Sequence, residues 1–118
     1  MKALYFEEHG ERDVLQYGDL PNLENKKNHV LIKVEACALN HLDVWIRRGW
    51  PGLNLAMPHI GGSDVSGIVI EGSGSWKEGD KVVVDPGISS TEDSWTEKGL
   101  DSMSPGYKIL GEHISGGC

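Results

Sequence analysis

One stretch of the chain decides the fold, because a strand pattern passes directly into a helix pattern. It reads Val30-Leu31-Ile32-Lys33-Val34-Glu35-Ala36-Cys37-Ala38-Leu39-Asn40-His41-Leu42-Asp43-Val44-Trp45-Ile46-Arg47-Arg48-Gly49. The residues before Asn40 alternate between two faces, which predicts a half-buried strand. Asn40 is a typical helix N-cap, Asp43 places an acid in the first turn, and Gly49 ends the apolar pattern. The sequence therefore predicts a strand over 30–39 followed by a short helix over 40–48.

The rest of the chain is rich in strands and turns. Alternating or apolar runs predict further strands over 1–6, 65–71 and 81–84. The 16 glycines among 118 residues are about twice the usual frequency, which favours a turn-rich chain over a helical bundle. We therefore predict a mainly β domain with one or two short helices, and partial helix or coil over 90–104.

Charge and cysteine content exclude several classes of function. The net charge is −7, which argues against nucleic acid and anionic membranes as partners. No apolar run is long enough to span a membrane, and the start of the chain turns acidic too early for a signal peptide. We therefore expect a cytoplasmic protein. The spacing of Cys37 and Cys118 matches neither a Cys-x-x-Cys pair nor a disulfide framework, so we expect both to be free thiols. We expect Cys37 to be a small core residue.

Motifs for holding a cofactor or metal are weak. Gly72-Ser73-Gly74-Ser75-Trp76-Lys77 offers two glycines of a dinucleotide-binding turn, but a lysine stands where the third is required, which favours a plain hairpin turn. Glu112, His113 and Cys118 are the tightest cluster of possible metal ligands. The sequence leaves open whether these three residues bind an adventitious metal ion.

Three ordered motifs resemble a known family. They are residues 38–49, Pro58-His59-Ile60-Gly61-Gly62-Ser63-Asp64-Val65-Ser66-Gly67-Ile68-Val69, and Gly79-Asp80-Lys81-Val82. Their order and spacing resemble the N-terminal catalytic domain of the medium-chain dehydrogenase/reductase superfamily. The resemblance covers essentially the whole chain. It implies that residues 1–118 form a GroES-like, partly open β-barrel that is incomplete, with the Rossmann cofactor domain absent.

The chain departs from the zinc-dependent members of this family at their ligand positions. By resemblance, Asn40 stands where these relatives carry a cysteine, Leu42 where they carry a hydroxyl, and Ser63-Asp64 where they carry a His-Glu pair. An amide and a hydroxyl are poor zinc ligands, so we expect no catalytic zinc.

A second departure concerns residues 86–107, which correspond to the lobe that holds structural zinc in relatives. Its four ligand positions lack cysteine and fall on Ser90, Asp93, Thr96 and Ser104. The lobe must therefore be held in another way or be loose, and its excess of acidic residues favours a loose lobe.

The resemblance implies the catalytic-domain portion of a zinc-free, NAD(P)H-dependent oxidoreductase that acts on a carbonyl, a quinone, another conjugated alkene or an alcohol. The implied site residues are Asn40, His41, Asp43, Ser63 and Asp64, with Asn40 and Asp43 also facing the cofactor. His41 is the candidate proton donor, because histidine is the side chain that most often gains and loses a proton near neutral pH. Simpler interpretations stay open: His41 as a solvent-facing helix residue, and Asn40 with Asp43 as a helix cap.

A non-enzymatic function also stays open. Because the chain carries no cofactor fingerprint of its own, we expect it to be inactive alone and to require the missing Rossmann domain. The alternative is a stand-alone β-barrel module for interaction or oligomerisation. Exposed strand edges would then favour a homodimer.

Overall fold

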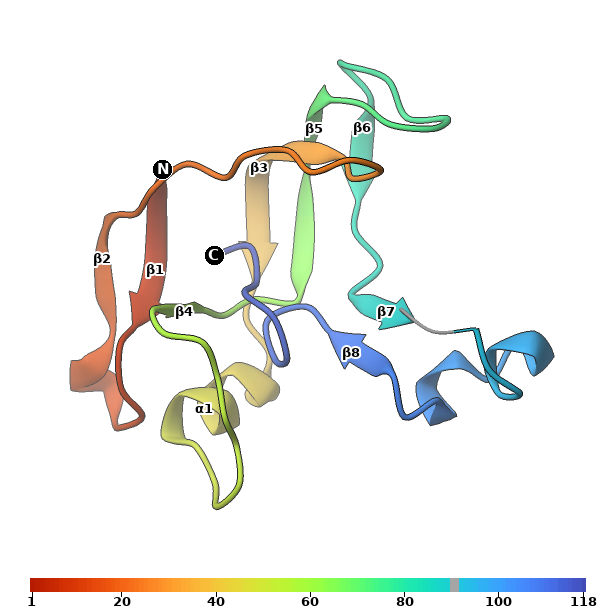
Figure 1. Cartoon of the computed structure of the whole chain (residues 1–118). Coiled ribbons are helices and arrows are strands. Elements are labelled where there is room, and N and C mark those ends of the chain that lie inside the picture. Colours follow the sequence, from red (N-terminus) through yellow and green to blue (C-terminus); the bar gives the residue numbers. More distant parts are fainter. Residues whose placement is uncertain (90–91) are drawn as a thin grey trace.

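Figure 1 shows the computed structural model, which describes residues 1–89 and 92–118. The expected ligand position Ser90 lies outside the described residues. In chain order the elements are β1 (Lys2–Phe6), the 3₁₀ turn η1 (Arg12–Val14), β2 (Gln16–Asp19), β3 (Leu31–Ala38), α1 (His41–Arg48), β4 (His59–Ile60), β5 (Asp64–Glu71), β6 (Lys81–Val83), β7 (Gly87–Ser89), the 3₁₀ turns η2 (Thr96–Lys98) and η3 (Asp101–Met103), and β8 (Tyr107–Ile109).

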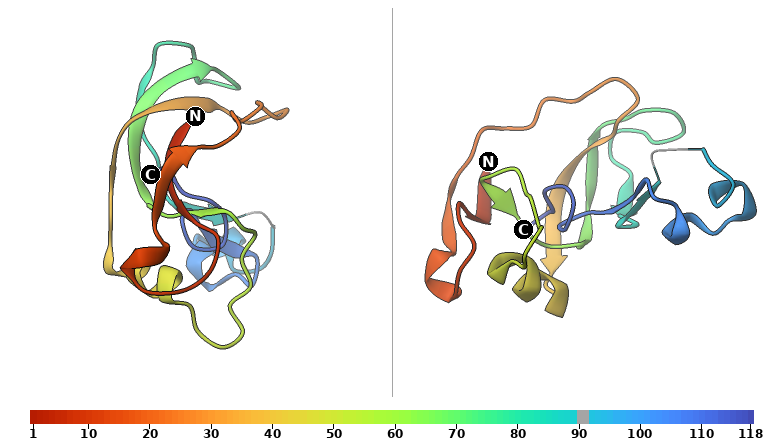
Figure 2. Two further views of the ribbon diagram at one scale, coloured as in Figure 1. Left: turned by 90° about the vertical axis from the view of Figure 1, so that its left-hand side faces the viewer. Right: turned by 60° about the horizontal axis from the view of Figure 1, so that its bottom comes forward.

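Two three-stranded antiparallel sheets form the body of the domain. Their strand orders are β2-β1-β4 and β3-β5-β6, and a separate antiparallel pair joins β7 to β8. The strands of the second sheet curve, as in an open barrel, while β7, β8 and the turns between them project to one side (Figures 1 and 2). The prediction of a mainly β domain with short helices is confirmed.

The turn between β5 and β6 is a hairpin, as the sequence predicted. The two strands pair antiparallel, with Gly67 opposite Val82. Val69 donates its backbone N–H to Asp80 and accepts one from Gly79, both at 2.9 Å. The Gly72–Lys77 segment therefore closes a hairpin and does not open a helix, as a dinucleotide-binding turn would require.

The half-buried alternation predicted for β3 was wrong. Residues 33–36 are all exposed, and Val34 keeps 43% of its surface exposed. The register of β3 against β5 shifts twice, between Leu31 and Ile32 and between Val34 and Ala36. Each irregularity disturbs the period of two on which the prediction rested.

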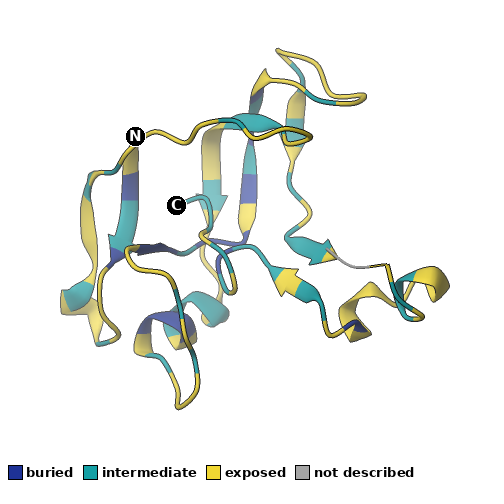
Figure 3. Ribbon diagram, in the orientation of Figure 1, coloured by how far each residue is buried: buried dark blue, intermediate teal, exposed yellow. Residues whose placement is uncertain are grey.

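The buried core is small and lies where β1, α1, β4 and β5 meet (Figure 3). Its apolar members are Ala3, Phe6, Ile46, Ile60, Val65 and Val69. His59 is 2% exposed, stacks at a tilt against Phe6, and donates its Nε2–H to the Gly111 carbonyl oxygen at 3.0 Å. This bond ties the C-terminal segment to the core.

The last residues run alongside β4 and the turn that follows it. Gly116 donates its N–H to Ile60, and Cys118 donates its N–H to Gly61 at 3.1 Å. The Cys118 carbonyl accepts the N–H of Leu4 at 2.9 Å. Cys118 is therefore fixed beside β1 and the Gly61-Gly62 turn.

The two cysteines form a disulfide, so the expectation of free thiols was wrong. Cys37 near the end of β3 and Cys118 are 81 residues apart in sequence, and no local motif indicates that the fold brings them together. Both residues are half-buried, so Cys37 is also not the core residue that we expected.

Candidate active site

The candidate site begins at the junction between β3 and α1. Asn40 is extended (φ −113°, ψ 169°) and occupies the N-cap position of α1. Asp43, three residues later, accepts the backbone N–H of Asn40 on Oδ2 at 2.7 Å. This bond satisfies one of the donors at the helix N-terminus and places a negative charge where the helix dipole favours it. The prediction of a helix that starts after Asn40 and ends at Gly49 is confirmed.

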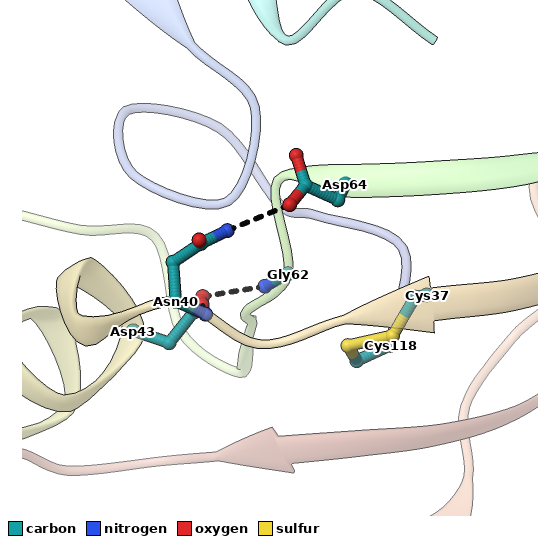
Figure 4. The surroundings of a disulfide bond; sticks show 6 residues. All are labelled: Cys37, Asn40, Asp43, Gly62, Asp64 and Cys118. Carbon is teal, nitrogen blue, oxygen red and sulfur yellow. Dashed lines mark hydrogen bonds between the residues drawn. A yellow bond between two sulfur atoms is a disulfide. The ribbon is translucent and has the colours of Figure 1, made fainter. Parts of the chain in front are cut away.

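Asp43 also joins the helix to the turn after β4. Its second oxygen, Oδ1, accepts the backbone N–H of Gly62 at 2.7 Å (Figure 4). The approach is close, because a Cβ added at Gly61 would lie only 3.0 Å from Asp43 Oδ1. With both oxygens engaged, the Asp43 carboxylate acts as a positioning group between two segments.

The Asn40 side chain crosses the same junction to the first residue of β5. Its Nδ2 donates to Asp64 Oδ2 at 3.0 Å (Figure 4). Because an ionised carboxylate can only accept, Asp64 fixes which end of the amide faces it. The Asn40 side chain also accepts the backbone N–H of Asp43 in a capping box, so among the described residues its second amide N–H is the group left for a bound molecule.

Ser63 lies between Gly62 and Asp64 in sequence and is 5% exposed. Its hydroxyl finds no hydrogen-bond partner within residues 1–89 and 92–118. Buried hydroxyls are normally satisfied, so this one marks a place where a ligand or water would complete the hydrogen bonding.

His41 is not part of the cluster formed by Asn40, Asp43 and Asp64. It is exposed on the first turn of α1, and its ring lies 5.0 Å from that of Trp45 at a 49° tilt. The structure thus brings Asn40, Asp43 and Asp64 together, and leaves His41 on the surface of the helix.

The residues present do not fit a catalytic zinc ion. Zinc prefers thiolate and imidazole ligands, whereas this junction offers an amide, a hydroxyl and the two carboxylates of Asp43 and Asp64. The amide and the carboxylate of Asn40 and Asp64 already satisfy each other. Within the described part of the chain, no group of three or more His, Cys, Asp or Glu residues could hold a metal ion.

The cluster of Glu112, His113 and Cys118 does not form a metal site either. The Cys118 sulfur is bonded to Cys37, so it offers no thiolate. His113 uses Nδ1 to accept the backbone N–H of Ile109 at 3.1 Å. The question that the sequence left open for these residues is therefore answered against an arrangement of three metal ligands.

The lobe over 86–107 is held by hydrogen bonds centred on Asp93. Oδ1 accepts the N–H groups of Trp95 and Thr96 at 2.9 and 3.1 Å, and Oδ2 accepts the Ser104 hydroxyl at 2.6 Å. Thr96 Oγ1 accepts the Asp93 N–H at 2.8 Å. Three of the four expected ligand positions therefore meet through hydrogen bonds, and the preference for a loose lobe was wrong.

We expect the lobe to weaken in acid through Asp93. The hydroxyl of Ser104 and the N–H of Thr96 lower the pKa of the Asp93 carboxyl below its ordinary value. Because the folded pKa is the lower one, this stabilisation is present above about pH 4 and is lost as the pH falls through the folded pKa. NMR of the Trp95 and Thr96 amides should follow a titration below pH 4, which Asp93→Asn abolishes and the exposed control Glu97→Gln preserves. Amide signals that titrate unchanged in Asp93→Asn would contradict this assignment.

A mostly apolar cavity of about 220 Å³ opens beside the site. Asn40, Asp43 and Gly61 line it together with Cys118 and apolar side chains of β1 and α1. Sequence reasoning missed Cys118 as a neighbour of the site. The available signal was that two cysteines allow a single intramolecular pairing.

Comparison with known proteins identifies the family. Residues 26–118 match the profile of the alcohol dehydrogenase GroES-like domain. The chain belongs to this family. The predicted GroES-like fold and the resemblance to the medium-chain dehydrogenase/reductase superfamily are thereby confirmed.

This GroES-like domain is similar to longer oxidoreductases. It is 45% identical over 87 residues to a quinone oxidoreductase of Sus scrofa, covering 71% of this chain and 26% of that protein. With a quinone oxidoreductase of Rattus norvegicus it shares 36% identity over 113 residues, covering 92% and 33%. The crystal structure of an NAD-dependent alcohol dehydrogenase superposes with a TM-score of 0.92 at 39% identity, covering 98% of this chain and 35% of that one.

The GroES-like domain spans about a third of the length of the relatives that it matches. It is thus homologous to the catalytic domains of medium-chain oxidoreductases. None of its described helices is both long and apolar enough to cross a membrane.

Proposed function

We propose that this domain forms one wall of the catalytic cleft of an NAD(P)H-dependent oxidoreductase that works without zinc. The observation that carries the proposal is the hydrogen bond to Asp64 from Asn40, which stands where the resemblance implies a cysteine ligand. This pairing presents an amide donor to a carboxylate, where a catalytic zinc would require thiolate and imidazole ligands. The substrate would be a carbonyl compound, a quinone or another conjugated alkene, or an alcohol in the reverse direction.

The residues of this chain fit one side of a nicotinamide site. A bound nicotinamide would supply or accept the hydride. Asn40 lines the cavity beside the site, where its side-chain amide can form a hydrogen bond with the carboxamide of a nicotinamide. Asp43 supports this contact indirectly, because its two oxygens hold Asn40 and Gly62 in place. The groups that bind the cofactor pyrophosphate would come from a Rossmann portion of a longer protein.

Polarisation of the substrate oxygen would rely on neutral hydrogen-bond donors. The second amide N–H of Asn40 and the hydroxyl of Ser63 are such donors, and preorganised donors stabilise a developing negative charge. His41 remains the proposed proton donor, and its exposure on α1 allows proton exchange with solvent.

The proposal requires activity in a longer protein that carries this domain with the following part of its gene product. We expect that protein to oxidise NADH or NADPH with at least one acceptor from a panel of quinones, enals and aldehydes. The 118-residue chain should neither turn over nor bind either nucleotide tightly. Failure of the longer protein to bind or oxidise either nucleotide would favour the non-enzymatic module.

The setting and the partners belong to the same proposal. We infer a cytoplasmic protein whose first partner is its own Rossmann portion. A homodimer would use a free strand edge such as β6, where Val83 is 82% exposed. A disulfide is uncommon in the reducing cytosol, which makes the oxidation state of Cys37 and Cys118 a question of its own.

A further inference from the structure

The disulfide lies at the junction that builds the candidate site. Cys37 is in β3, three residues before Asn40, and Cys118 lies against the Gly61-Gly62 turn (Figure 4). The Cys118 N–H donates to the Gly61 carbonyl at 3.1 Å, and a Cβ added at Gly62 would overlap the Cys118 sulfur. Each sulfur therefore belongs to a segment that touches one half of the site.

The same two segments are joined by the hydrogen bonds that position the site residues. Asp43 accepts the backbone N–H of Gly62, and the Asn40 side-chain amide donates to the Asp64 carboxylate. The Asn40–Asp64 bond is exposed to water, whereas the bond from the buried Gly62 to Asp43 is partly shielded from it. The disulfide is the covalent link that keeps Cys118 packed on Gly62, and Gly62 in turn presents its N–H to Asp43.

Small thiols can reach this bond. Both cysteines are half-buried, and Cys118 lines the cavity that also contains Asn40 and Asp43. Thiol–disulfide exchange depends on such access.

We propose that the Cys37–Cys118 pair is a reversible redox clasp that sets the geometry of the Asn40–Asp43–Asp64 site. Its effect on activity rests on the proposed function, whereas its effect on the site does not. The oxidised clasp holds the Gly62 N–H against Asp43. Reduction frees residues 116–118 from Gly62 and loosens the site.

A dithiol is the reductant that opens the Cys37–Cys118 disulfide, and a small disulfide is the oxidant that closes it again. In reduction, one thiolate of a dithiol attacks one of the two sulfurs and the other leaves as a thiolate, which takes up a proton. The second thiol of the dithiol then displaces the attacked sulfur, so two electrons pass to the protein and the dithiol becomes a disulfide. Oxidation runs in reverse with a low-molecular-weight disulfide such as oxidised glutathione, which is reduced to two thiols.

Amide hydrogen exchange on the 118-residue chain tests the clasp. Without reductant, the Gly62 N–H should be protected by its bond to Asp43, and addition of dithiothreitol should speed its exchange at least tenfold. The Val69 N–H, which donates to Asp80 in the β5–β6 hairpin, is the internal control and should change less than twofold. Cys118→Ser should match the reduced protein and should not respond to dithiothreitol.

Two outcomes would overturn the proposal. If dithiothreitol leaves the exchange rate of the Gly62 N–H unchanged, the geometry of the site does not depend on the disulfide. Equal acceleration at Gly62 and Val69, or unfolding on reduction, would show that the bond only stabilises the whole domain. Cys37→Ser provides the same comparison from the β3 side if Cys118→Ser fails to fold.

Activity of the longer protein separates this proposal from the proposed function. We expect reduction to lower kcat/KM at least fivefold in the wild type and to leave Cys118→Ser unchanged. A response at Gly62 with no hydride transfer in either redox state would refute the proposed function and leave the clasp standing. Activity that is independent of the redox state would overturn the clasp and leave the function standing.

Discussion

Gly67→Ala is expected to lower the free energy of unfolding by about 3 kcal/mol, because β5 has no room for a side chain at this position. Gly67 pairs with Val34 of β3 on one side and with Val82 of β6 on the other. An added Cβ would overlap the Lys33 carbonyl oxygen and lie 2.8 Å from Ile32 Cγ2. A backbone oxygen in a paired strand cannot move without breaking the ladder. Urea denaturation followed by tryptophan fluorescence measures the loss.

Gly52→Ala is the matched control for this substitution. Gly52 has φ +92°, but a Cβ there would meet nothing within 4 Å. The free energy of unfolding of Gly52→Ala should therefore fall only by the cost of a left-handed conformation at alanine, about 1 kcal/mol. Equal losses in the two variants would mean that crowding at Gly67 is not the cause.

Asn40→Ala in the longer protein is expected to lower kcat/KM about 100-fold, the usual effect of removing one preorganised donor from a transition state. The stability loss should stay near 1 kcal/mol, because the side chain makes an exposed hydrogen bond to Asp64 and caps the N-terminus of α1. Asp64→Asn should give a smaller kinetic loss, since it keeps the Asn40 amide and removes only the charge that orients it. Steady-state kinetics with the best acceptor of the panel measure both effects.

Asn54→Ala serves as the control for Asn40→Ala. Asn54 is an exposed asparagine in the loop after α1, and its removal should leave kcat/KM within twofold of the wild type. An Asn40→Ala enzyme that is equally unaffected would remove Asn40 from the catalytic machinery.

Local features were predictable from the sequence because they depend on neighbouring residues. Asn40, Asp43 and Gly49 marked the limits of α1, and the Gly72-Ser73-Gly74 turn marked the hairpin. The positions of Asn40 and Asp64 could be inferred from the resemblance. Their direct hydrogen bond could not, because it depends on how β3 and β5 pair.

Features that depend on register or on long-range contacts could not be predicted. Val34 is exposed although the alternation places it on the apolar face, and it lies in a strand whose register against β5 shifts twice. The Cys37–Cys118 disulfide joins two residues that lie 81 positions apart in the sequence. The order of the 86–107 lobe was missed because counting acidic residues ignores the donors that Asp93 receives from Trp95, Thr96 and Ser104.

The proposal that the site works without zinc is tested most directly by measuring kcat/KM of the longer protein against its bound zinc. We expect full activity after treatment with a chelator, at a zinc content far below one ion per chain. Addition of zinc should not raise that activity, because the described residues of this domain include no group of three or more ligands that could hold the ion. Activity that is lost with the chelator and returns in proportion to zinc, up to one ion per chain, would contradict the proposed mechanism.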